Sequence, residues 1–336
     1  MEPRFSYIQL TPKQVLTRPR GQEASFIMRR LEGVMALTYT PLKEDYRLNE
    51  DAVRREIDWV IQRGAAGIWP GGYAGQWPEL DEEVRKRHLK VCIDHAKGRV
   101  FCAAGCHATH TLQTIRLANY AEEIGYDCAW VSPTMPRKAT EDEIYEHHKL
   151  ILDRTTIPIA LYDSSPAGSY MSPELIARIV EMSPRMIAMK AIVGDIVHIA
   201  SLYHFGVDKR ISILGVEWNM LPHLLLGAPG AMGGSDWIPA MRATYEAFKS
   251  GNMNRAWELQ KAIIAQSPLL IPRTASSTTG NKIDHSGIGY LKARFSLMSG
   301  IDIGPPMPPY FPASEAEVEK AKNGIRSLEA LLAKPT

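Results

Sequence analysis

The 336-residue sequence predicts a single-domain α/β protein with the fold of a (β/α)8 barrel. The first observation is that short apolar runs alternate with longer stretches of helical periodicity, in eight successive units. The second is that these runs are apolar throughout, as in parallel strands whose two faces are both buried. The third is that eight such units are the number that closes a barrel. A doubly wound open sheet is the alternative, but the turn after the first run lacks a GxGxxG segment.

The predicted strands are apolar runs rich in Val, Ile, Ala and Trp. They are Val34–Pro41, Ala66–Pro70, Val100–Gly105, Cys128–Pro133, Ile157–Tyr162, Met186–Ile192, Ile211–Val216 and Gly230–Gly234.

Between the strands, the helical stretches begin at recognisable caps. Asn49, Thr140 and Ser172 each precede a first turn that contains acidic residues, which favours a helix start. The predicted helices span residues 50–63, 80–96, 111–124, 141–154, 173–182, 194–205, 219–226 and 239–250.

Three segments make up the predicted domain organisation. Residues 1–30 are polar and contain proline, so we expect an N-terminal arm. Residues 31–250 form the barrel. Residues 251–336 add helices at Met253–Gln266, Ile288–Met298 and Ser314–Leu332, which we expect to pack on the barrel as a C-terminal extension.

Composition and charge exclude some classes of function. Lys and Arg number 39 against 37 Asp and Glu, with no basic run, which argues against nucleic acid or an anionic membrane as the main partner. The N-terminus has no apolar signal segment, and no apolar stretch is long enough to span a bilayer. Of the four cysteines, Cys102 and Cys128 lie in apolar runs, as buried thiols do. We expect a soluble protein of the reducing cytoplasm.

The active site of this fold lies where the strands end. Lys190 lies within the sixth predicted strand, an apolar run that should be buried, where an ammonium ion is costly to accommodate. Burial lowers the pKa of a lysine, and a neutral amine attacks carbonyl carbons to form an imine. The alternative is a strand-end lysine whose charge reaches solvent. Tyr162 ends the neighbouring strand and is a candidate proton shuttle beside Lys190.

Other candidate substrate-binding residues follow the strand ends. The loop Gly72, Tyr73, Ala74 and Gly75 offers successive backbone N–H groups, which suit a carboxylate. A flexible turn is the alternative for that loop, and a solvated acid is the alternative for Glu217. The remaining candidates are Met135, Ser164, Gly215, Trp218 and Ser235.

Five segments of the chain, taken in order, match motifs of a known family. They are Gly72–Leu80 with Glu82 and Glu83, Leu161–Asp163, Ala188–Asp195, Gly227–Ser235 with Pro239, and Asn252–Leu259. Together they resemble the dihydrodipicolinate synthase / N-acetylneuraminate lyase superfamily, whose members are class I pyruvate-dependent aldolases, and the resemblance extends from about Gly33 to Leu332. It implies that Lys190 forms the imine with pyruvate, that no metal or organic cofactor is needed, and that the protein is a homotetramer or dimer of dimers.

Departures from the family pattern concern the second substrate. Tyr73 and Ala74 replace the usual hydroxyl residues of the loop, and Ser132–Met135 lacks the tyrosine of the lysine-biosynthesis members. The loop after Tyr162 contains no arginine for a second carboxylate. These differences argue against aspartate semialdehyde as the acceptor.

Aromatic residues at the strand ends indicate an apolar or aromatic aldehyde instead. They are Trp69, Trp77, Trp218 and Trp237, together with Tyr73. We therefore expect a hydratase-aldolase-like lyase that joins or separates pyruvate and such an aldehyde. The alternatives are 4-hydroxy-tetrahydrodipicolinate synthase, a sugar-acid aldolase or dehydratase of the same superfamily, and a non-catalytic barrel that binds a 2-oxo acid.

Two histidine-containing segments have less specific interpretations. Cys106 and His110 have a spacing that could hold zinc, but no second cluster completes a site. A metal-dependent hydrolase would also need a strand-end His-x-His, which the sequence lacks. His147 and His148 are expected on a solvated helix face.

Overall fold

The computed structural model describes residues 31–133, 138–163, 171–192, 195–266 and 287–334. The predicted N-terminal arm therefore lies outside the described residues. Eight parallel strands form a closed barrel in sequential order, because β8 pairs with β1. The strands are β1 (Gly33–Leu37), β2 (Gly67–Trp69), β3 (Phe101–Gly105), β4 (Cys128–Val131), β5 (Ile159–Asp163), β6 (Met186–Ala191), β7 (Ser212–Val216) and β8 (Gly230–Gly234).

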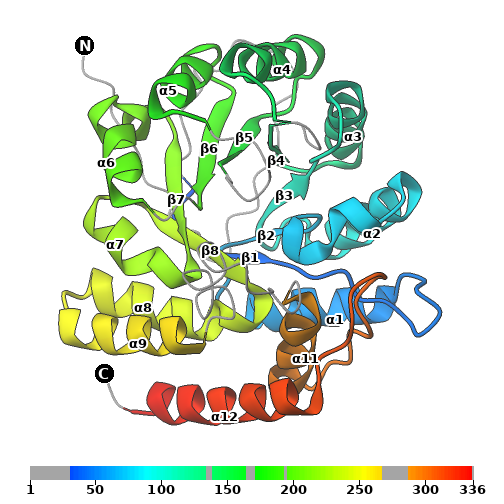
Figure 1. Ribbon diagram of the computed structural model, residues 1–336, viewed down its shortest axis with the longest axis vertical. Helices are drawn as coiled ribbons and strands as arrows, with labels where there is room; N and C mark the ends of the chain where they lie inside the picture. Colours follow the sequence, from blue (N-terminus) through cyan, green and yellow to red (C-terminus); the bar gives the residue numbers. More distant parts are fainter. Residues whose placement is uncertain (1–30, 134–137, 164–170, 193–194, 267–286, 335–336) are drawn as a thin grey trace.

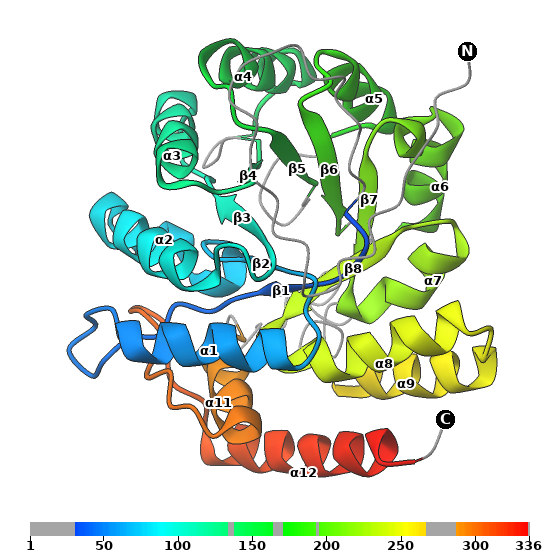
Figure 2. The same cartoon turned by 180° about the vertical axis from the view of Figure 1, so that it is seen from behind.

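One helix follows each strand and covers the outside of the barrel (Figures 1 and 2). The predicted caps are confirmed: Asn49 accepts the Ala52 N–H at 3.2 Å, Thr140 forms a capping box with Glu143, and Ser172 caps the fifth helix. These helices are α1 (Glu50–Gln62), α2 (Glu82–Ala96), α3 (Thr111–Ile124), α4 (Glu141–Arg154), α5 (Pro173–Glu181), α6 (Ile196–His204), α7 (Met220–Leu225) and α8 (Ile238–Lys249).

Among the described residues, three further helices lie outside this ring, at the same side of the barrel as α1 and α8 (Figures 1 and 2). They are α9 (Met253–Gln266), α11 (Ile288–Ser299) and α12 (Glu315–Leu332). The helix α9 packs against α8, and α12 contacts both α9 and α11.

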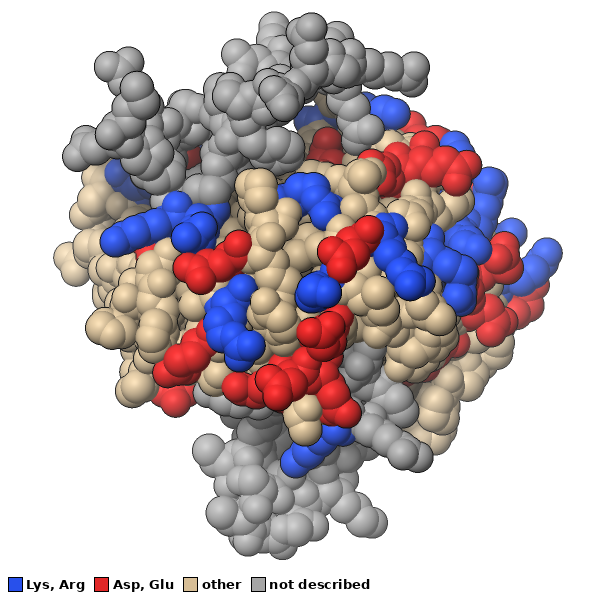
Figure 3. Space-filling view, turned by 90° about the horizontal axis from the view of Figure 1, so that it is seen from above, with Lys and Arg blue, Asp and Glu red and all other residues tan. Residues whose placement is uncertain are grey.

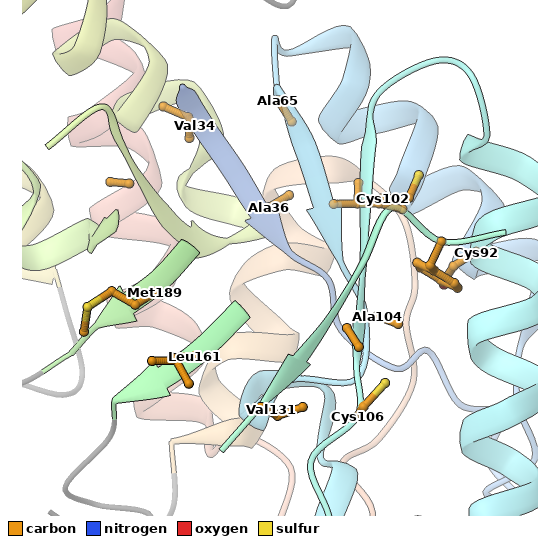
Figure 4. Close-up of a cluster of buried hydrophobic side chains, with 14 of the residues drawn as sticks. Val34, Ala36, Ala65, Cys92, Cys102, Ala104, Cys106, Val131, Leu161 and Met189 are labelled. Atoms are coloured by element: carbon orange, nitrogen blue, oxygen red, sulfur yellow. The ribbon is translucent and has the colours of Figure 1, made fainter. Parts of the chain in front are cut away.

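Side chains of each strand alternate between two cores. One core lies between strands and helices, and the other fills the barrel interior. Figure 4 shows outward-facing members of the first core, among them Ala36, Ala104, Leu161 and Met189. The interior core contains Met35, Trp69, Cys128, Trp130, Ala160, Tyr162, Ala188, Leu214 and Met232.

The structure corrects the predicted end of the first strand and the predicted exposure of two histidines. The first strand ends at Leu37 and not at Pro41, because the backbone beyond it leaves the sheet: the Tyr39 N–H binds Glu56 and the Leu42 N–H binds Ile303. His147 and His148 are buried, not solvated. The ring of His147 binds the Ser132 carbonyl, which ties α4 to the end of β4.

The face of the molecule in Figure 3 carries mixed charge, because Lys and Arg side chains of the described residues are interspersed there with Asp and Glu side chains. All four cysteines are buried free thiols, which confirms the prediction for Cys102 and Cys128. Within the described ranges, no helix combines the length and apolarity needed to cross a bilayer.

Candidate active site

Lys190 lies inside the barrel near the carboxyl end of β6. Ala188, two residues earlier, belongs to the interior core, and strand alternation places Lys190 on the same face. Only 4% of Lys190 is exposed. Burial lowers the pKa of Lys190 to about 8, and the charge of Glu217 opposes this shift. A larger share of this amine is therefore neutral near pH 7 than in an ordinary lysine.

Tyr162 is the direct neighbour of Lys190, as the strand order predicts. The two residues are register partners in the β5–β6 pairing. The Lys190 Nζ lies 4.9 Å from the centroid of the Tyr162 ring and 5.2 Å from that of Trp69. The amine is thus in contact with two aromatic faces, which attract its charged form only moderately.

Glu217 follows β7 and faces the same region. Its side chain is 7% exposed, and the Oε2 atom has no hydrogen-bond partner among the described residues. Burial raises the pKa of Glu217 to about 7, while Lys190 acts in the opposite direction. The solvated-acid interpretation is therefore wrong. A buried carboxyl group and a buried amine, each shifted towards neutrality, are groups that can exchange protons with a substrate near neutral pH.

Aromatic rings surround the lysine. Trp69 stacks on Trp130 with ring centroids 4.6 Å apart, and it forms a T-shaped pair with Tyr162, with ring centroids 5.5 Å apart. Trp130 is held in place because its indole N–H donates to the Leu161 carbonyl at 2.9 Å. These rings make the surroundings of the amine largely apolar, which is the cause of its lowered pKa.

His107, two residues after β3, extends this aromatic cluster. Its ring centroid lies 5.5 Å from that of Trp69, 5.9 Å from that of Trp77 and 5.3 Å from that of Tyr162. The backbone of His107 is anchored by Arg85 of α2, whose Nη2 donates to the His107 carbonyl at 2.6 Å.

The glycine-rich loop after β2 forms a short 3-10 turn, Tyr73–Gly75. Gly75 is buried, and its carbonyl accepts a hydrogen bond of 2.6 Å from Thr40. The Gly75 N–H donates to the Gly72 carbonyl, so the expected run of free N–H groups is shorter than the sequence predicts. The first N–H groups of a 3-10 turn have no acceptor within the turn. In this loop they are the N–H groups of Tyr73 and Ala74, which could therefore bind a ligand. The Tyr73 side chain is 45% exposed.

A close approach of two backbones fixes this loop. Gly71 has φ +78°, and a Cβ atom at Gly105 would overlap the Gly71 carbonyl. We expect Gly105→Ala to lower the free energy of unfolding by about 3 kcal/mol, the upper part of the range for overpacking. Urea unfolding measures this. Gly72→Ala is the matched control, because its Cβ would meet nothing closer than Trp69 at 3.6 Å; an equal loss in both variants would contradict the prediction.

Several residues that the sequence predicted at the site either do not face Lys190 or lie outside the described residues. Met135 and Ser164 lie outside the described residues. Ser235 is fully buried and donates to Glu56 of α1 at 2.6 Å, so its hydroxyl is not free to donate to a substrate. Gly215 is buried on β7 against His223 of α7, and Trp218 is partly buried beside Glu217.

Of the four tryptophans predicted at the strand ends, the structure brings together Trp69 and Trp77 around His107. Trp237 instead packs beneath Arg294 of α11, whose guanidinium carbon lies 3.7 Å from the ring centroid. Trp130 also belongs to this aromatic group, and the sequence pattern did not predict it, although its place in β4 fits an inward position. His107 lies within the zinc-like segment between Cys106 and His110, and the sequence did not predict it at the site. The structure separates that segment: Cys106 is buried, whereas His110 is exposed and caps α3.

The fold and the site together define a class of protein. A closed (β/α)8 barrel with a buried lysine on β6, in register with a tyrosine on β5, is the arrangement that the resemblance to the pyruvate-dependent aldolase superfamily predicts.

Comparison with known proteins narrows this class to a family. A sequence model of the Dihydrodipicolinate synthetase family matches residues 30–321, and the chain belongs to this family, whose members are enzymes of the lyase or synthase type. The 4-hydroxy-tetrahydrodipicolinate synthase of Methanopyrus kandleri is 26% identical over 306 residues, covering 90% of this chain and 98% of the relative. The synthase of the same name from Methanothrix thermoacetophila is 30% identical over 232 residues, covering 68% and 77%.

A solved structure shows the same fold. YagE of E. coli K12, a member of the dihydrodipicolinic acid synthase family crystallised in complex with pyruvate, matches with a TM-score of 0.79 and 22% identity. The match covers 89% of this chain and 98% of YagE.

Proposed function

We propose that this protein is a class I aldolase that forms an imine between Lys190 and pyruvate, and that it joins or separates pyruvate and an apolar or aromatic aldehyde. The observation that carries the proposal is the Lys190 amine, 4% exposed, with its pKa lowered to about 8 and its Nζ against the Tyr162 ring. Such an amine is a nucleophile near neutral pH.

In the proposed mechanism, the neutral Lys190 amine attacks C2 of the 2-oxo acid, and Tyr162 passes protons as the carbinolamine loses water. The 2-oxo acid is pyruvate in the joining direction and a 4-hydroxy-2-oxo acid in the cleavage direction. The resulting iminium withdraws electrons from C3. In the cleavage direction, the C3–C4 bond of a 4-hydroxy-2-oxo acid breaks, the C4 hydroxyl loses its proton, and the aldehyde leaves. The enamine then takes a proton at C3, and hydrolysis releases pyruvate and the free amine. This covalent imine performs the electron withdrawal, so the proposed reaction needs no metal or organic cofactor.

Two observations support the choice of substrates. Pyruvate is the ligand named for YagE, whose fold this chain shares. The aldehyde is proposed to be apolar or aromatic because the rings of Trp69, Trp130 and Tyr162 adjoin Lys190. The relatives from Methanopyrus kandleri and Methanothrix thermoacetophila favour a second candidate, 4-hydroxy-tetrahydrodipicolinate synthase. Against it, the sequence has no tyrosine in Ser132–Met135 and no arginine between Tyr162 and Tyr170.

Reductive trapping tests the proposal. The protein is incubated with pyruvate and sodium borohydride, and peptide mapping by mass spectrometry locates any pyruvyl group. We expect the group on Lys190. Lys292 is an internal control: it is 3% exposed with a pKa lowered to about 7, but its Nζ donates to the carbonyls of Thr40 and Pro305, so it should stay unmodified.

The results of trapping and of an aldehyde assay distinguish the candidate functions. Absence of a pyruvyl group on Lys190 contradicts the aldolase proposal and leaves a non-catalytic barrel. After trapping is established, the protein is assayed with pyruvate and benzaldehyde, an aliphatic aldehyde, a sugar aldehyde or aspartate semialdehyde. A preference for benzaldehyde is expected, whereas a preference for aspartate semialdehyde would establish the second candidate.

The pH dependence of trapping follows from the lowered pKa of Lys190. Because only the neutral amine attacks, the trapping rate with cyanoborohydride should rise about tenfold per pH unit and level off above about 8, well below the ordinary lysine value of about 10.4. Since the Glu217 carboxylate raises the pKa of Lys190, Glu217→Gln should move the midpoint to lower pH. A midpoint near that of free lysine, or a shift in the other direction in Glu217→Gln, would contradict the assignment.

A further inference from the structure

His107 is a buried polar side chain that the mechanism above does not use. Its exposure is 0%, and neither ring nitrogen has a hydrogen-bond partner among the described residues. An imidazole always carries at least one N–H donor, and a buried donor or acceptor without a partner costs free energy. In folded proteins such groups are uncommon and are usually met by water or a ligand.

The position of His107 makes a substrate the fitting partner. Its ring contacts the rings of Trp69 and Tyr162, the same two rings that the Lys190 Nζ contacts. Arg85 holds the backbone at this point by donating to the carbonyls of Gly105 and His107. The ring is thus fixed beside the amine on a rigid support and not on a freely moving loop.

The protonation state of His107 indicates what kind of atom it would bind. Burial lowers the pKa of His107 well below the ordinary histidine value, and the charges of Arg85 and Lys190 act in the same direction. The ring is therefore neutral at pH 7, with one N–H donor and one acceptor nitrogen. A neutral donor suits an uncharged carbonyl oxygen, whereas a carboxylate is better met by backbone N–H groups such as those of Tyr73 and Ala74.

Other buried histidines do not share this environment. His223 also has two ring nitrogens without partners among the described residues, but it lies on α7 and packs against Gly215 of β7. His147 binds Thr111 and the Ser132 carbonyl. Among these three, His107 is the one whose ring contacts the aromatic groups around Lys190.

We propose that His107 donates a hydrogen bond to the carbonyl oxygen of the aldehyde substrate, and so determines specificity for the second substrate of the proposed aldolase. The simplest aromatic aldehydes have one polar atom, the carbonyl oxygen, and the rings of Trp69 and Trp77 that adjoin His107 suit the apolar part. This inference rests on the proposed function, and it assigns His107 to the aldehyde and not to pyruvate.

Two variants of the full-length protein test the assignment. His107→Phe keeps a flat ring and removes both nitrogens, whereas His107→Asn keeps a donor and an acceptor. In His107→Phe we expect pyruvate trapping on Lys190 to continue, and kcat/KM for benzaldehyde to fall by about 10- to 100-fold, as for loss of one hydrogen bond in a desolvated site. His107→Asn should recover part of that loss. The same substitutions at His223 are the matched control and should leave both measurements near those of the unaltered protein.

Thermal unfolding separates substrate binding from a structural role. Because His107 makes no side-chain hydrogen bond with the described residues, His107→Phe should not lower the melting temperature. Unchanged benzaldehyde kinetics in His107→Phe would overturn the inference. If the melting temperature were lowered in addition, the ring nitrogens would be assigned to a bound water. An equal loss of trapping and condensation would also overturn the inference, because His107 would then act on pyruvate or Lys190. If the unaltered protein itself forms no pyruvyl adduct, it is the proposed function that fails.

Discussion

Lys190→Met is expected to abolish pyruvate trapping and to lower the rate of aldehyde condensation by at least about 10⁴-fold, because the nucleophile of a covalent mechanism cannot be replaced by neighbouring groups. Methionine has a similar length, so the interior packing around Trp69 and Ala188 should be kept. Removing a buried amine also removes its desolvation cost, so the melting temperature should stay the same or rise. Trapping, condensation and thermal unfolding are measured on the same preparation.

Lys190→Arg is the control for charge. The guanidinium keeps a positive charge near Glu217 but is not a nucleophile at neutral pH, so this variant should be as inactive as Lys190→Met. Substantial turnover in either variant would show that the charge or another group carries the reaction. Loss of activity together with loss of folding in Lys190→Met would leave Lys190→Arg as the deciding measurement.

Arg294→Met is expected to cause the largest loss of stability, about 3–5 kcal/mol in the free energy of unfolding. Arg294 of α11 forms an ion pair with Asp236, and both side chains are fully buried. The other Asp236 oxygen accepts a 2.5 Å hydrogen bond from Tyr39, which follows β1. Without the guanidinium, the Asp236 carboxylate stays buried with one neutral donor, which leaves an uncompensated charge in the core.

Chemical unfolding at fixed protein concentration measures this effect, since any self-association makes the midpoint depend on concentration. Lys90→Met is the matched control, because it removes an exposed ion pair with Asp94 and should change stability by less than about 0.5 kcal/mol. Adding Asp236→Leu to Arg294→Met should recover part of the loss, because the orphaned charge is then gone. A loss below about 1 kcal/mol in Arg294→Met would contradict the prediction.

The barrel and its central pair of residues could be predicted from the sequence. Eight apolar runs with helical stretches between them specify eight strands, and a lysine within the sixth run is conspicuous because burying its charge is costly. Since consecutive strands of a barrel are neighbours, Tyr162 on β5 had to lie beside Lys190 on β6, and the register places them directly opposite.

The surroundings of that pair could not be predicted in the same way. His107 and Glu217 lie just beyond strand ends, where periodicity no longer says whether a side chain faces solvent or the barrel. Both are buried near Lys190. The Ser235 hydroxyl was expected to face a substrate, and it binds Glu56, which is 179 positions away in the sequence. Contacts of such separation leave no local pattern.

The sequence by itself determined the fold class, the order of the strands and the adjacency of Lys190 and Tyr162, because hydrophobic periodicity and strand order are properties of local segments. The tertiary structure alone decided which charges are buried together. It grouped Lys190 with Glu217 and the rings of Trp69 and Trp130, and it joined Arg294 to Asp236. The physical reason is that desolvation and Coulomb interactions depend on distances in space, and closing the barrel sets those distances between residues far apart in the chain.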